Sequence, residues 1–413
     1  MPMALLKYGL RRSYRPEPFL PPQPDLKPAY DVVVIGGGGH GLAIAYHLAR
    51  DHGIRDVAVI EKGYIGGGNT ARNTAIVRAN YLTPDGVAFY KESMDLWRGL
   101  PAELDINLMY SERGHLTLAH TDATVKTMRR RAEVNKHLGV DSELIGLDEL
   151  ARLCPVLDLS RSARFPVLGA LYHRPGATAR HDAVAWGYAR AASRLGVEIH
   201  QGTEAIGMVR EGNRVVAVDT PRGRIAAGGV VQAVAGASIQ VAAMAGLALP
   251  IHPVPLQACV SVPMKPVLDP IVVSGSLHLY IWQSQRGEMV MGGSVDPYPL
   301  HATRSTLDFK EGLMMHIVEL FPFLAEARLM RQWAGVADVT ADFSPIMGTT
   351  PLDNYYVDAG WGTWGFKATP VSGKRMAECA ATGRQPALIE PFRLDRFTTL
   401  RLVAERGAAS VET

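Results

Sequence analysis

The chain has little cysteine. Cys154, Cys259 and Cys379 are the only three among 413 residues, and no C-x-x-C pair occurs. Disulfide frameworks of small secreted proteins use dense sets of cysteines, and structural zinc sites use closely spaced ligands. The sequence therefore predicts neither a disulfide framework nor a metal site, and we expect the protein in a reducing cytoplasm.

The chain also lacks a dense run of one charge and a long apolar segment. Its 43 basic and 40 acidic side chains give a formal charge of +3, so we expect no nucleic-acid partner. The longest stretch without Asp, Glu, Lys or Arg, residues 225–264, is interrupted by glutamine, glycine and proline. We therefore predict no membrane span, and residues 1–10 are too weakly apolar for a signal peptide.

Apolar side chains and glycine are abundant. Apolar residues make up 47% of the chain, and 41 residues are glycine. This composition is typical of an α/β protein rich in turns. The length predicts one large domain or two or three interlocked ones. Residues 15–28 contain six prolines, so we expect an extended N-terminal arm that either lies on a partner or is a flexible leader.

A dinucleotide-binding pattern follows this arm. Residues 31–35 read as a buried strand, residues 36–41 as the loop Gly-Gly-Gly-Gly-His-Gly, and residues 42–50 as an amphipathic helix. A strand, a G-x-G-x-x-G loop and a helix together place the positive end of the helix against a pyrophosphate.

Each glycine of this loop has an expected task. Gly36 allows the tight turn, Gly38 lets the backbone approach the phosphates, and Gly41 lets helix and strand pack closely. A second strand at residues 57–60 ends in Glu61, which we expect to accept hydrogen bonds from the ribose hydroxyls. An acid at this place argues against the 2′-phosphate of NADP.

Two further glycine-rich segments suggest a flavin. Residues 63–74 could wrap the isoalloxazine end of FAD, although a plain surface turn has a similar composition. Residues 360–367 follow a short strand at 354–359 and precede a helix expected at about 371–381. The start of that helix is suited to the negative charge of a reduced flavin, and Lys367 can add a positive charge or hold a substrate carboxylate.

Two middle segments complete the expected architecture. Residues 230–237 read as a strand that enters a turn beneath the cofactor, where Ala235 and Gly236 contribute backbone only. Residues 276–282 and 288–294 read as a hairpin from a second, β-rich domain that covers the flavin.

The chain resembles the β subunits of heterotetrameric sarcosine oxidase, within the glycine oxidase and D-amino-acid oxidase group of flavoproteins. The similarity is carried by residues 36–41, 67–81, 179–186, 252–258, 361–363 and 365–370. It extends over nearly the whole chain, and the segments at 67–81 and 179–186 are specific beyond a general dinucleotide-binding match.

The resemblance implies a mixed α/β fold, with a Rossmann-like FAD-binding domain and an interleaved β-rich substrate domain. The expected division gives the FAD-binding domain residues 30–110, 150–250 and 330–390, and the substrate domain residues 111–149 and 251–329. Residues 1–29 form the arm and residues 391–413 a C-terminal tail.

The resemblance also implies two flavins and several partners. FAD is expected to bind noncovalently, and FMN is expected to be joined to His181 at an interface with the α subunit, beside γ and δ subunits. From the sequence alone, His181 is a single histidine at the start of a helix, for which a capping or solvated role is the ordinary interpretation. His173 lies outside the matching Arg180-His181-Asp182 segment and is not expected to carry FMN.

The expected chemistry is oxidation of an N-methyl amino acid such as sarcosine to glycine, with oxygen reduced to peroxide and the one-carbon unit released as formaldehyde or passed to folate. We expect Arg78 and Lys367 to be the catalytic pair that binds the substrate carboxylate. An ordinary ion pair is the alternative for Arg78, and Arg72 is a less favoured substitute. Trp364 stands where the family usually has a small glycine, which would change the pocket volume and with it the substrate.

The residues expected to bind the two flavins come from all these segments. They are Gly36, Gly38, Gly39, His40, Gly41, Glu61, Lys62, Gly68, Asn69, Thr70, Asn73, Thr74, Ile76, His181, Ala205, Ala235, Gly236, Gly362, Thr363, Gly365 and Lys367. Two other functions remain open at this point. One is a subunit of a related dehydrogenase, for example one that uses N-methylglutamate, and the other is a flavin-bound assembly subunit without turnover of its own.

Overall fold

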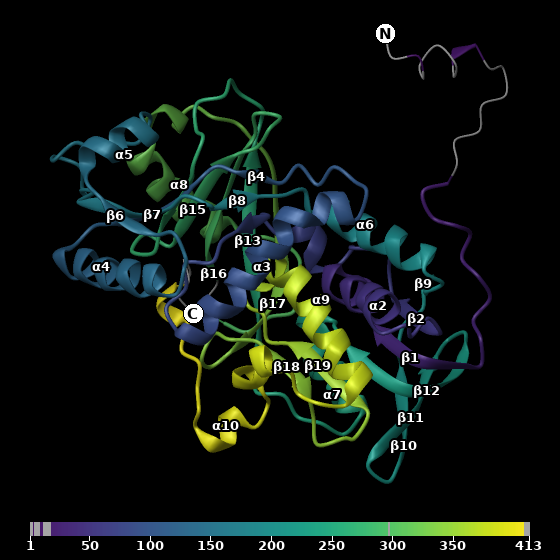
Figure 1. Cartoon of the computed structure of the whole chain (residues 1–413). Helices are drawn as coiled ribbons and strands as arrows, with labels where there is room; N and C mark the ends of the chain where they lie inside the picture. Colours follow the sequence, from purple (N-terminus) through teal and green to yellow (C-terminus); the bar gives the residue numbers. More distant parts are fainter. Residues whose placement is uncertain (1–2, 4–8, 11–17, 296–297, 409–413) are drawn as a thin grey trace.

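The computed structural model describes residues 3, 9–10, 18–295 and 298–408. Within residues 18–28, the described part of the predicted arm, the chain forms no helix or strand and runs along the outside of the molecule (Figure 1). The Gln23 side chain exchanges hydrogen bonds with the backbone of Gln201, and Lys27 pairs with Glu198 at 2.7 Å. The rest of the predicted arm lies outside the described residues.

The first large sheet has a parallel centre. Its strands lie in the order β9, β2, β1, β12 and β19, with β18 antiparallel to β19 and the β10–β11 hairpin paired to the first half of β12. The bounds are β1 Ala29–Ile35, β2 Val57–Glu61, β9 Glu198–Gln201, β10 Gly207–Glu211, β11 Arg214–Thr220, β12 Gly223–Gln232, β18 Ile346–Thr349 and β19 Tyr355–Ala359. The continuous apolar runs of β1 and β2 suit this position, because both faces of the sheet are covered.

Four helices lie on one face of this sheet and a short one on the other. They are α2 Gly39–Asp51, α3 Pro84–Glu103, α6 His181–Arg194 and α9 Gly365–Thr382, and on the opposite face α7 Ser238–Met244. Helix α2 packs between α6 and α9, and α3 packs on α9 (Figure 1). This layered arrangement brings the N-termini of α2 and α9 close to each other.

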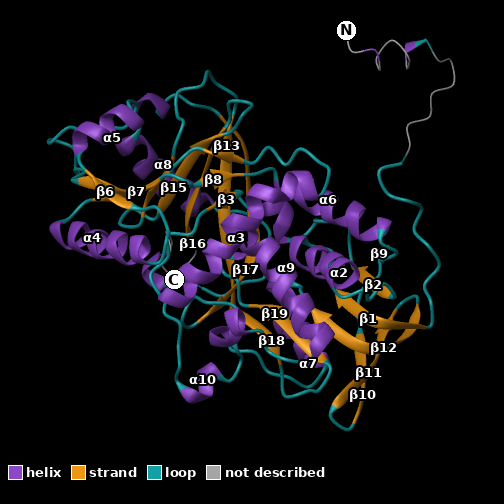
Figure 2. Cartoon of the chain, in the orientation of Figure 1, coloured by secondary structure: helices purple, strands orange, loops and turns teal. Residues whose placement is uncertain are grey.

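The second large sheet is almost entirely antiparallel, and only the β5–β14 pair is parallel. Its order is β17, β13, β16, β15, β14, β5, β7 and β6. In Figure 2, the strands β6, β7 and β15 of this sheet lie apart from β1, β2 and β12 of the first sheet. The bounds are β5 His115–Ala119, β6 Glu143–Ile145, β7 Gly169–His173, β13 Ile251–Ser261, β14 Ile271–Ser274, β15 Leu279–Gln283, β16 Met289–Val295 and β17 Leu329–Thr340.

Smaller elements complete the described chain. Three short strands form a separate sheet beside the second one, and further helices pack around it or follow α9. They are β3 Ile76–Val77, β4 Ser111–Glu112 and β8 Ala177–Thr178; α4 Asp122–His137, α5 Leu147–Leu153, α8 Leu307–Leu320 and α10 Arg396–Thr399; and the 3-10 helices η1 Asn69–Arg72, η2 Ala235–Ala237, η3 Pro322–Leu324, η4 Ala387–Phe392 and η5 Arg406–Ala408.

The predicted fold class is confirmed: a Rossmann-like parallel sheet with helices on both faces is interleaved along the chain with a β-rich region. The division into residue ranges stays a prediction. Strands β7 and β17 lie in or next to ranges expected to belong to the FAD-binding domain, yet both pair in the second sheet. In the described part of the chain, no helix combines the length and the apolar character that a membrane crossing requires.

Helix α9 begins six residues earlier than the sequence indicates. The sequence analysis places the start at about residue 371, whereas the helix includes Pro370, which lacks the N–H that a helix interior uses. In the structure the Thr369 hydroxyl donates to the carbonyl of Phe366 at 2.8 Å, which is the carbonyl that Pro370 leaves without its usual donor. The extra turn carries Gly365 and Lys367 into the candidate site.

Candidate functional site

The loop between β1 and α2 has the geometry of a phosphate-binding turn. Gly36 has a φ of +113°, which favours glycine, and its N–H donates to the carbonyl of Ile60 at 2.9 Å. A Cβ atom at Gly41 would overlap the carbonyl of Gly36, so only glycine permits this approach of helix and loop. Gly38, which directly precedes α2, and Gly39 keep the backbone at the helix N-terminus free of side chains.

Glu61 lies at the end of β2 beside this loop. Its carboxylate accepts hydrogen bonds from the backbone N–H of Gly37 at 2.9 Å and of Gly63 at 2.7 Å. An ionised carboxylate has about four acceptor positions, so acceptors remain for ribose hydroxyls. Lys62 is exposed, and Ala205 is buried in the same apolar cluster as Ile60.

The segment at 63–74 closes over the start of α2. Thr70 accepts a hydrogen bond from the N–H of Gly39 at 3.0 Å, which ties η1 to the helix N-terminus. Asn69 instead clamps β17, because its amide donates to the carbonyl of Val336 at 2.6 Å and accepts from the Val336 N–H at 3.1 Å. Gly68 precedes η1 and is exposed.

The end of this segment joins the two sheets. Asn73 accepts from the N–H of Ala75 at 2.6 Å and donates to the carbonyl of Thr70, so its side chain shapes the turn. Thr74 bonds to the Tyr280 hydroxyl, and Ile76 packs on an apolar cluster of the second sheet. Thr74 and Ile76 therefore lie where a flavin ring would meet the second sheet.

The second glycine-rich loop is fixed by β17. Gly360 donates to the Asp338 carboxylate at 2.7 Å, and Gly362 donates to the Asp338 carbonyl at 2.9 Å. Burial raises the pKa of Asp338 to about 6. The carbonyl of Gly365 lies 2.7 Å from the His40 ring, so this loop and the first one are in direct contact.

The two cations expected to bind substrate meet at one indole. Arg78 is 5% exposed and its guanidinium carbon lies 5.3 Å from the centre of the Trp364 ring. Lys367 is 7% exposed, its Nζ also lies 5.3 Å from that ring centre, and it donates to the carbonyl of Thr363 at 3.1 Å. The fold thus brings together Arg78 and Lys367, which lie 289 positions apart in the sequence.

The electrostatics of this place favour an anion. Burial, and then the Arg78 charge, hold the pKa of Lys367 well below its ordinary value. Burial and Arg78 likewise lower the pKa of His115, and burial lowers that of His173 to about 3, so both histidines are neutral. A carboxylate bound beside Arg78 and Lys367 would be attracted by their positive charges, and its negative charge would favour the charged form of Lys367.

Arg131 and Asn80 belong to the same cluster, and the sequence analysis missed both. Asn80 accepts from Arg78 Nη1 at its carbonyl, 3.1 Å, and at its side-chain oxygen, 2.8 Å, while Arg131 donates to the same carbonyl. Burial, and then Arg78, lower the pKa of Arg131 to about 9. A signal was present: Arg131 lies three residues after Met128 and four before Asn135, on the buried face of α4.

Several buried polar atoms around this cluster have no hydrogen-bond partner within the described residues. They are Asn80 Nδ2, His115 Nδ1, Arg131 Nε and Thr363 Oγ1. An unsatisfied buried polar group costs about 1–3 kcal/mol. Their concentration beside two buried cations indicates that a polar ligand binds there.

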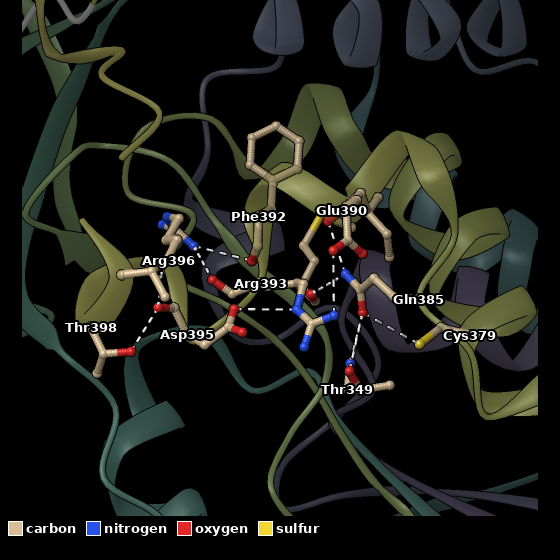
Figure 3. Close-up of polar contacts among 12 residues, drawn as sticks. Thr349, Cys379, Gln385, Glu390, Phe392, Arg393, Asp395, Arg396 and Thr398 are labelled. Atoms are coloured by element: carbon tan, nitrogen blue, oxygen red, sulfur yellow. Dashed lines mark hydrogen bonds and ion pairs between the residues drawn. The ribbon is translucent and has the colours of Figure 1, made fainter. Parts of the chain in front are cut away.

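The C-terminal segment reaches this cluster from the opposite end of the chain. A series of polar contacts holds the chain after α9 in place, as Figure 3 shows. Gln385 accepts from the N–H of Thr349 at 3.0 Å, and Arg396 donates to the carbonyl of Phe392 at 3.1 Å. This part of the predicted tail is therefore folded against the molecule.

A buried ion pair adds to these polar contacts. Arg396 and Asp342 lie 2.8 Å apart and both side chains are at most 2% exposed. Asp342 also accepts from the N–H of Glu405 at its carbonyl, 3.0 Å. The Glu405 carboxylate accepts from the N–H of Leu82 and of Thr83, both at 2.9 Å, and is an acid close to Arg131.

His181 lies apart from the cation cluster. It is the first residue of α6, is half-buried, and its ring hydrogen-bonds the backbone of Ala71 in η1. Burial lowers its pKa below the ordinary value. The Arg180 side chain pairs with Asp182 at 2.8 Å, so the two charged neighbours of His181 bond to each other.

The remaining predicted positions serve the framework. Ala235, with a φ of +47°, and Gly236 form η2, which packs on β17. Arg72 donates to the carbonyl of Gly68 at 2.8 Å, within its own loop. The structure therefore separates Arg72 from Arg78 in role, and Arg78 stays the predicted substrate residue.

Comparisons with known proteins agree with this geometry. A family model described as FAD dependent oxidoreductase matches residues 31–379. The structure is similar to that of L-proline dehydrogenase from P. horikoshii, with a TM-score of 0.85 and 30% identity, over 92% of this chain and 100% of that one. The chain belongs to the family of FAD-dependent oxidoreductases.

Sequence similarity narrows the family. The chain is 46% identical to the sarcosine oxidase subunit beta of Arthrobacter sp over 393 residues, 95% of this chain and 97% of that protein. It is 47% identical to the sarcosine oxidase subunit beta of Rhizobium meliloti over 385 residues, 93% and 92% of the two chains. Within its family the chain belongs with the sarcosine oxidase β subunits, and the predicted resemblance is confirmed.

The residues present fit FAD. The loop at Gly36–Gly41 leaves backbone N–H groups at the start of α2, which suits a pyrophosphate, and Glu61 has acceptors for a ribose. The unsatisfied Thr363 hydroxyl lies at the second loop, beside the start of α9. The individual contacts of the predicted cofactor residues stay predictions.

Proposed function

We propose that the chain binds an N-methyl amino acid, with sarcosine as the first candidate, at the cluster formed by Arg78, Lys367 and Trp364. The observation that carries this proposal is the burial of two cations on one indole without a carboxylate paired to Lys367 within the described residues. A substrate carboxylate supplies the missing negative charge. The names of the similar proteins support the choice of sarcosine.

Arg78 and Lys367 act as binding and orienting groups in this proposal. Arg78 is held by Asn80, whose carbonyl and side-chain oxygen both accept from Arg78 Nη1, and the planar guanidinium has the shape for a bidentate carboxylate contact. Lys367 is fixed by the first turn of α9 and adds a second, single-point contact. Together they orient the N-methyl group away from the carboxylate, toward the loops that hold the cofactor.

Bound FAD supplies the acceptor for the hydride taken from the N-methyl carbon. The overall reaction consumes sarcosine, oxygen and water and gives glycine, formaldehyde and hydrogen peroxide. The chain's own contribution is to bind the substrate in a site where Trp364 and neighbouring aromatic rings exclude water.

The second flavin is also part of the proposal. We infer that FMN is joined covalently to His181 and lies between this chain and an α subunit, in a complex that also contains γ and δ subunits. Support comes from the position of the His181 ring, half-buried at the chain surface and bonded to Ala71 beside the expected FAD segment. A cytoplasmic location belongs to the same proposal.

The test uses the complex obtained by co-expression with the partner subunits. We expect sarcosine to be oxidised with hydrogen peroxide formed, and acid-precipitated chain to carry FMN mass on the peptide that contains His181. Turnover only with an artificial electron acceptor, and only with a larger N-methyl amino acid such as N-methylglutamate, would favour a dehydrogenase. Absence of any turnover in a complex that holds FAD would favour an assembly role.

A further inference from the structure

His40 lies in the first turn of α2, between the two glycine-rich loops. Its Nδ1 is 2.7 Å from Oδ2 of Asp358, and its Nε2 is 2.7 Å from the carbonyl oxygen of Gly365. The ring also packs edge-on against Trp361, with 4.6 Å between ring centres. Asp358 is the last residue but one of β19 and its side chain is fully buried, so His40 joins α2 to both β19 and α9.

Counting donors and acceptors determines the charge of this ring. A carbonyl oxygen only accepts hydrogen bonds, so Nε2 must carry a proton to bond to Gly365. Oδ1 of Asp358 accepts from the Trp361 indole and the Ser372 hydroxyl, both at 3.0 Å, while Oδ2 faces Nδ1 of His40. An ionised carboxylate also only accepts, so Nδ1 carries a proton as well and the ring is an imidazolium.

The charged groups that face the ring support this assignment. They are Asp358 on β19 and Asp338 on β17, both carboxylates. Burial by itself would lower the pKa of His40, but the Asp358 charge and the hydrogen bonds to Asp358 and Gly365 outweigh it and raise the pKa above 6.5.

We propose that the His40 imidazolium clasps the two glycine-rich loops together and thereby sets the affinity of the chain for FAD. It is a positioning residue, which acts through Gly365 and Asp358 and adds positive charge at the start of α2, where the pyrophosphate binds. This inference rests on the FAD dependence of the family and not on the identity of the amine substrate.

The clasp makes FAD affinity depend on pH in one direction. A histidine whose pKa is raised in the folded protein contributes fully below 6.5, the ordinary value, and loses its contribution as the pH rises through the raised pKa. FAD and the His40 proton favour each other's binding, because linkage between two ligands is reciprocal. FAD should therefore be held most tightly below this transition and released more readily above it.

The first experiment compares His40→Gln with a matched control, His47→Gln. His47 lies on the same helix, is also buried, and also bonds a carboxylate, Asp51 at 2.6 Å, but contacts neither loop in the described structure. FAD dissociation constants are measured on the full chain in its complex, by quantifying FAD in ultrafiltrates between pH 6 and pH 9. Circular dichroism checks that each variant is folded.

We expect the wild type and His47→Gln to lose FAD affinity with the same midpoint as the pH rises. His40→Gln should bind FAD at least tenfold more weakly at pH 6 and show no transition of this kind. An FAD affinity and a pH profile in folded His40→Gln that match the wild type would overturn the proposal.

A second variant keeps the test decisive if His40→Gln does not fold. Asp358→Asn removes the carboxylate charge that raises the His40 pKa and leaves an amide oxygen that can still accept from Trp361 and Ser372. We expect the pH midpoint for FAD release to move to lower pH. An unchanged midpoint in Asp358→Asn, or an FAD affinity of the wild type that is flat from pH 6 to pH 9, would contradict the imidazolium clasp.

Discussion

The glycine loop at β1–α2 and the cation cluster at Arg78 are built from different materials. The loop is made of backbone, and its amides are close to their partners Ile60, Glu61 and Thr70 in the structure. The cluster is made of long side chains from α4, α9 and the segment that follows β3, and among the described residues it contains buried polar atoms without a hydrogen-bond partner. Helix α9 connects them, because Gly365 contacts His40 and Lys367 contacts Trp364.

This difference assigns different tasks to the two regions. A site made of backbone is rigid without its ligand and suits a cofactor that stays bound. A site that contains buried cationic side chains is stabilised when an anion arrives, which suits a substrate that comes and goes. Changes in the loop should therefore affect FAD content, and changes in the cluster should affect substrate kinetics while FAD remains bound.

The largest effect is expected from Gly41→Ala. The added methyl group would overlap the carbonyl of Gly36, so the loop must move and nearly all bound FAD should be lost. FAD content per chain is measured by absorbance and chromatography after denaturation. Gly99→Ala in α3 is the matched control, because its methyl group would meet no atom within 4 Å. Full FAD occupancy in Gly41→Ala would contradict the assignment of the β1–α2 loop to FAD binding.

Arg78→Gln should change substrate kinetics and leave FAD content unchanged. We expect kcat/KM for sarcosine to fall by roughly 100-fold, about 3 kcal/mol, because a charge-assisted contact to a buried carboxylate is lost. FAD content should not change. Arg98→Gln, an exposed arginine on α3 that pairs with Glu112 at 2.7 Å, is the control and should behave as the wild type. Unchanged kcat/KM in Arg78→Gln would remove Arg78 from the substrate site.

The smallest effect is expected from Arg131→Gln. Arg131 holds the carbonyl of Asn80, which in turn holds Arg78, so its loss should loosen Arg78 and raise KM by about tenfold, ~1.4 kcal/mol. The value of kcat should change less than KM. Arg130→Gln changes the adjacent, exposed arginine and should leave both constants as they are. Equal kinetic constants for the two variants would show that Arg131 has no positioning role.

The same comparison explains how far the sequence alone could be interpreted. The dinucleotide loop is local, so the strand at 31–35, the glycines and Glu61 were predictable from spacing within about 30 residues. The strands β1, β2 and β19 and the hairpin of β15 and β16 also formed close to their expected positions. For these elements, patterns among residues close together in the sequence were sufficient.

The cation cluster was less predictable, because it depends on tertiary packing. Arg78 and Lys367 were anticipated through the family resemblance, but Arg131 and Glu405 come from segments without a motif, and Asn80 lies in a matching segment without a role assigned to its side chain. The early start of α9 escaped the sequence because the Thr369 hydroxyl compensates for Pro370, a contact that no pattern of residue types announces. Asn69 and Asn73 were predicted to bind the cofactor, but the Asn69 side chain bonds to β17 and the Asn73 side chain bonds within its own loop.

The central claim is that the Arg78–Lys367 cluster binds the substrate carboxylate beside FAD. The most direct measurement is a structure of the FAD-loaded complex with an unreactive carboxylate analogue of sarcosine that lacks the amine. We predict that the carboxylate contacts the Arg78 guanidinium and Lys367 Nζ, above the Trp364 ring. A carboxylate bound elsewhere, with Arg78 and Lys367 unchanged in their contacts, would contradict the account.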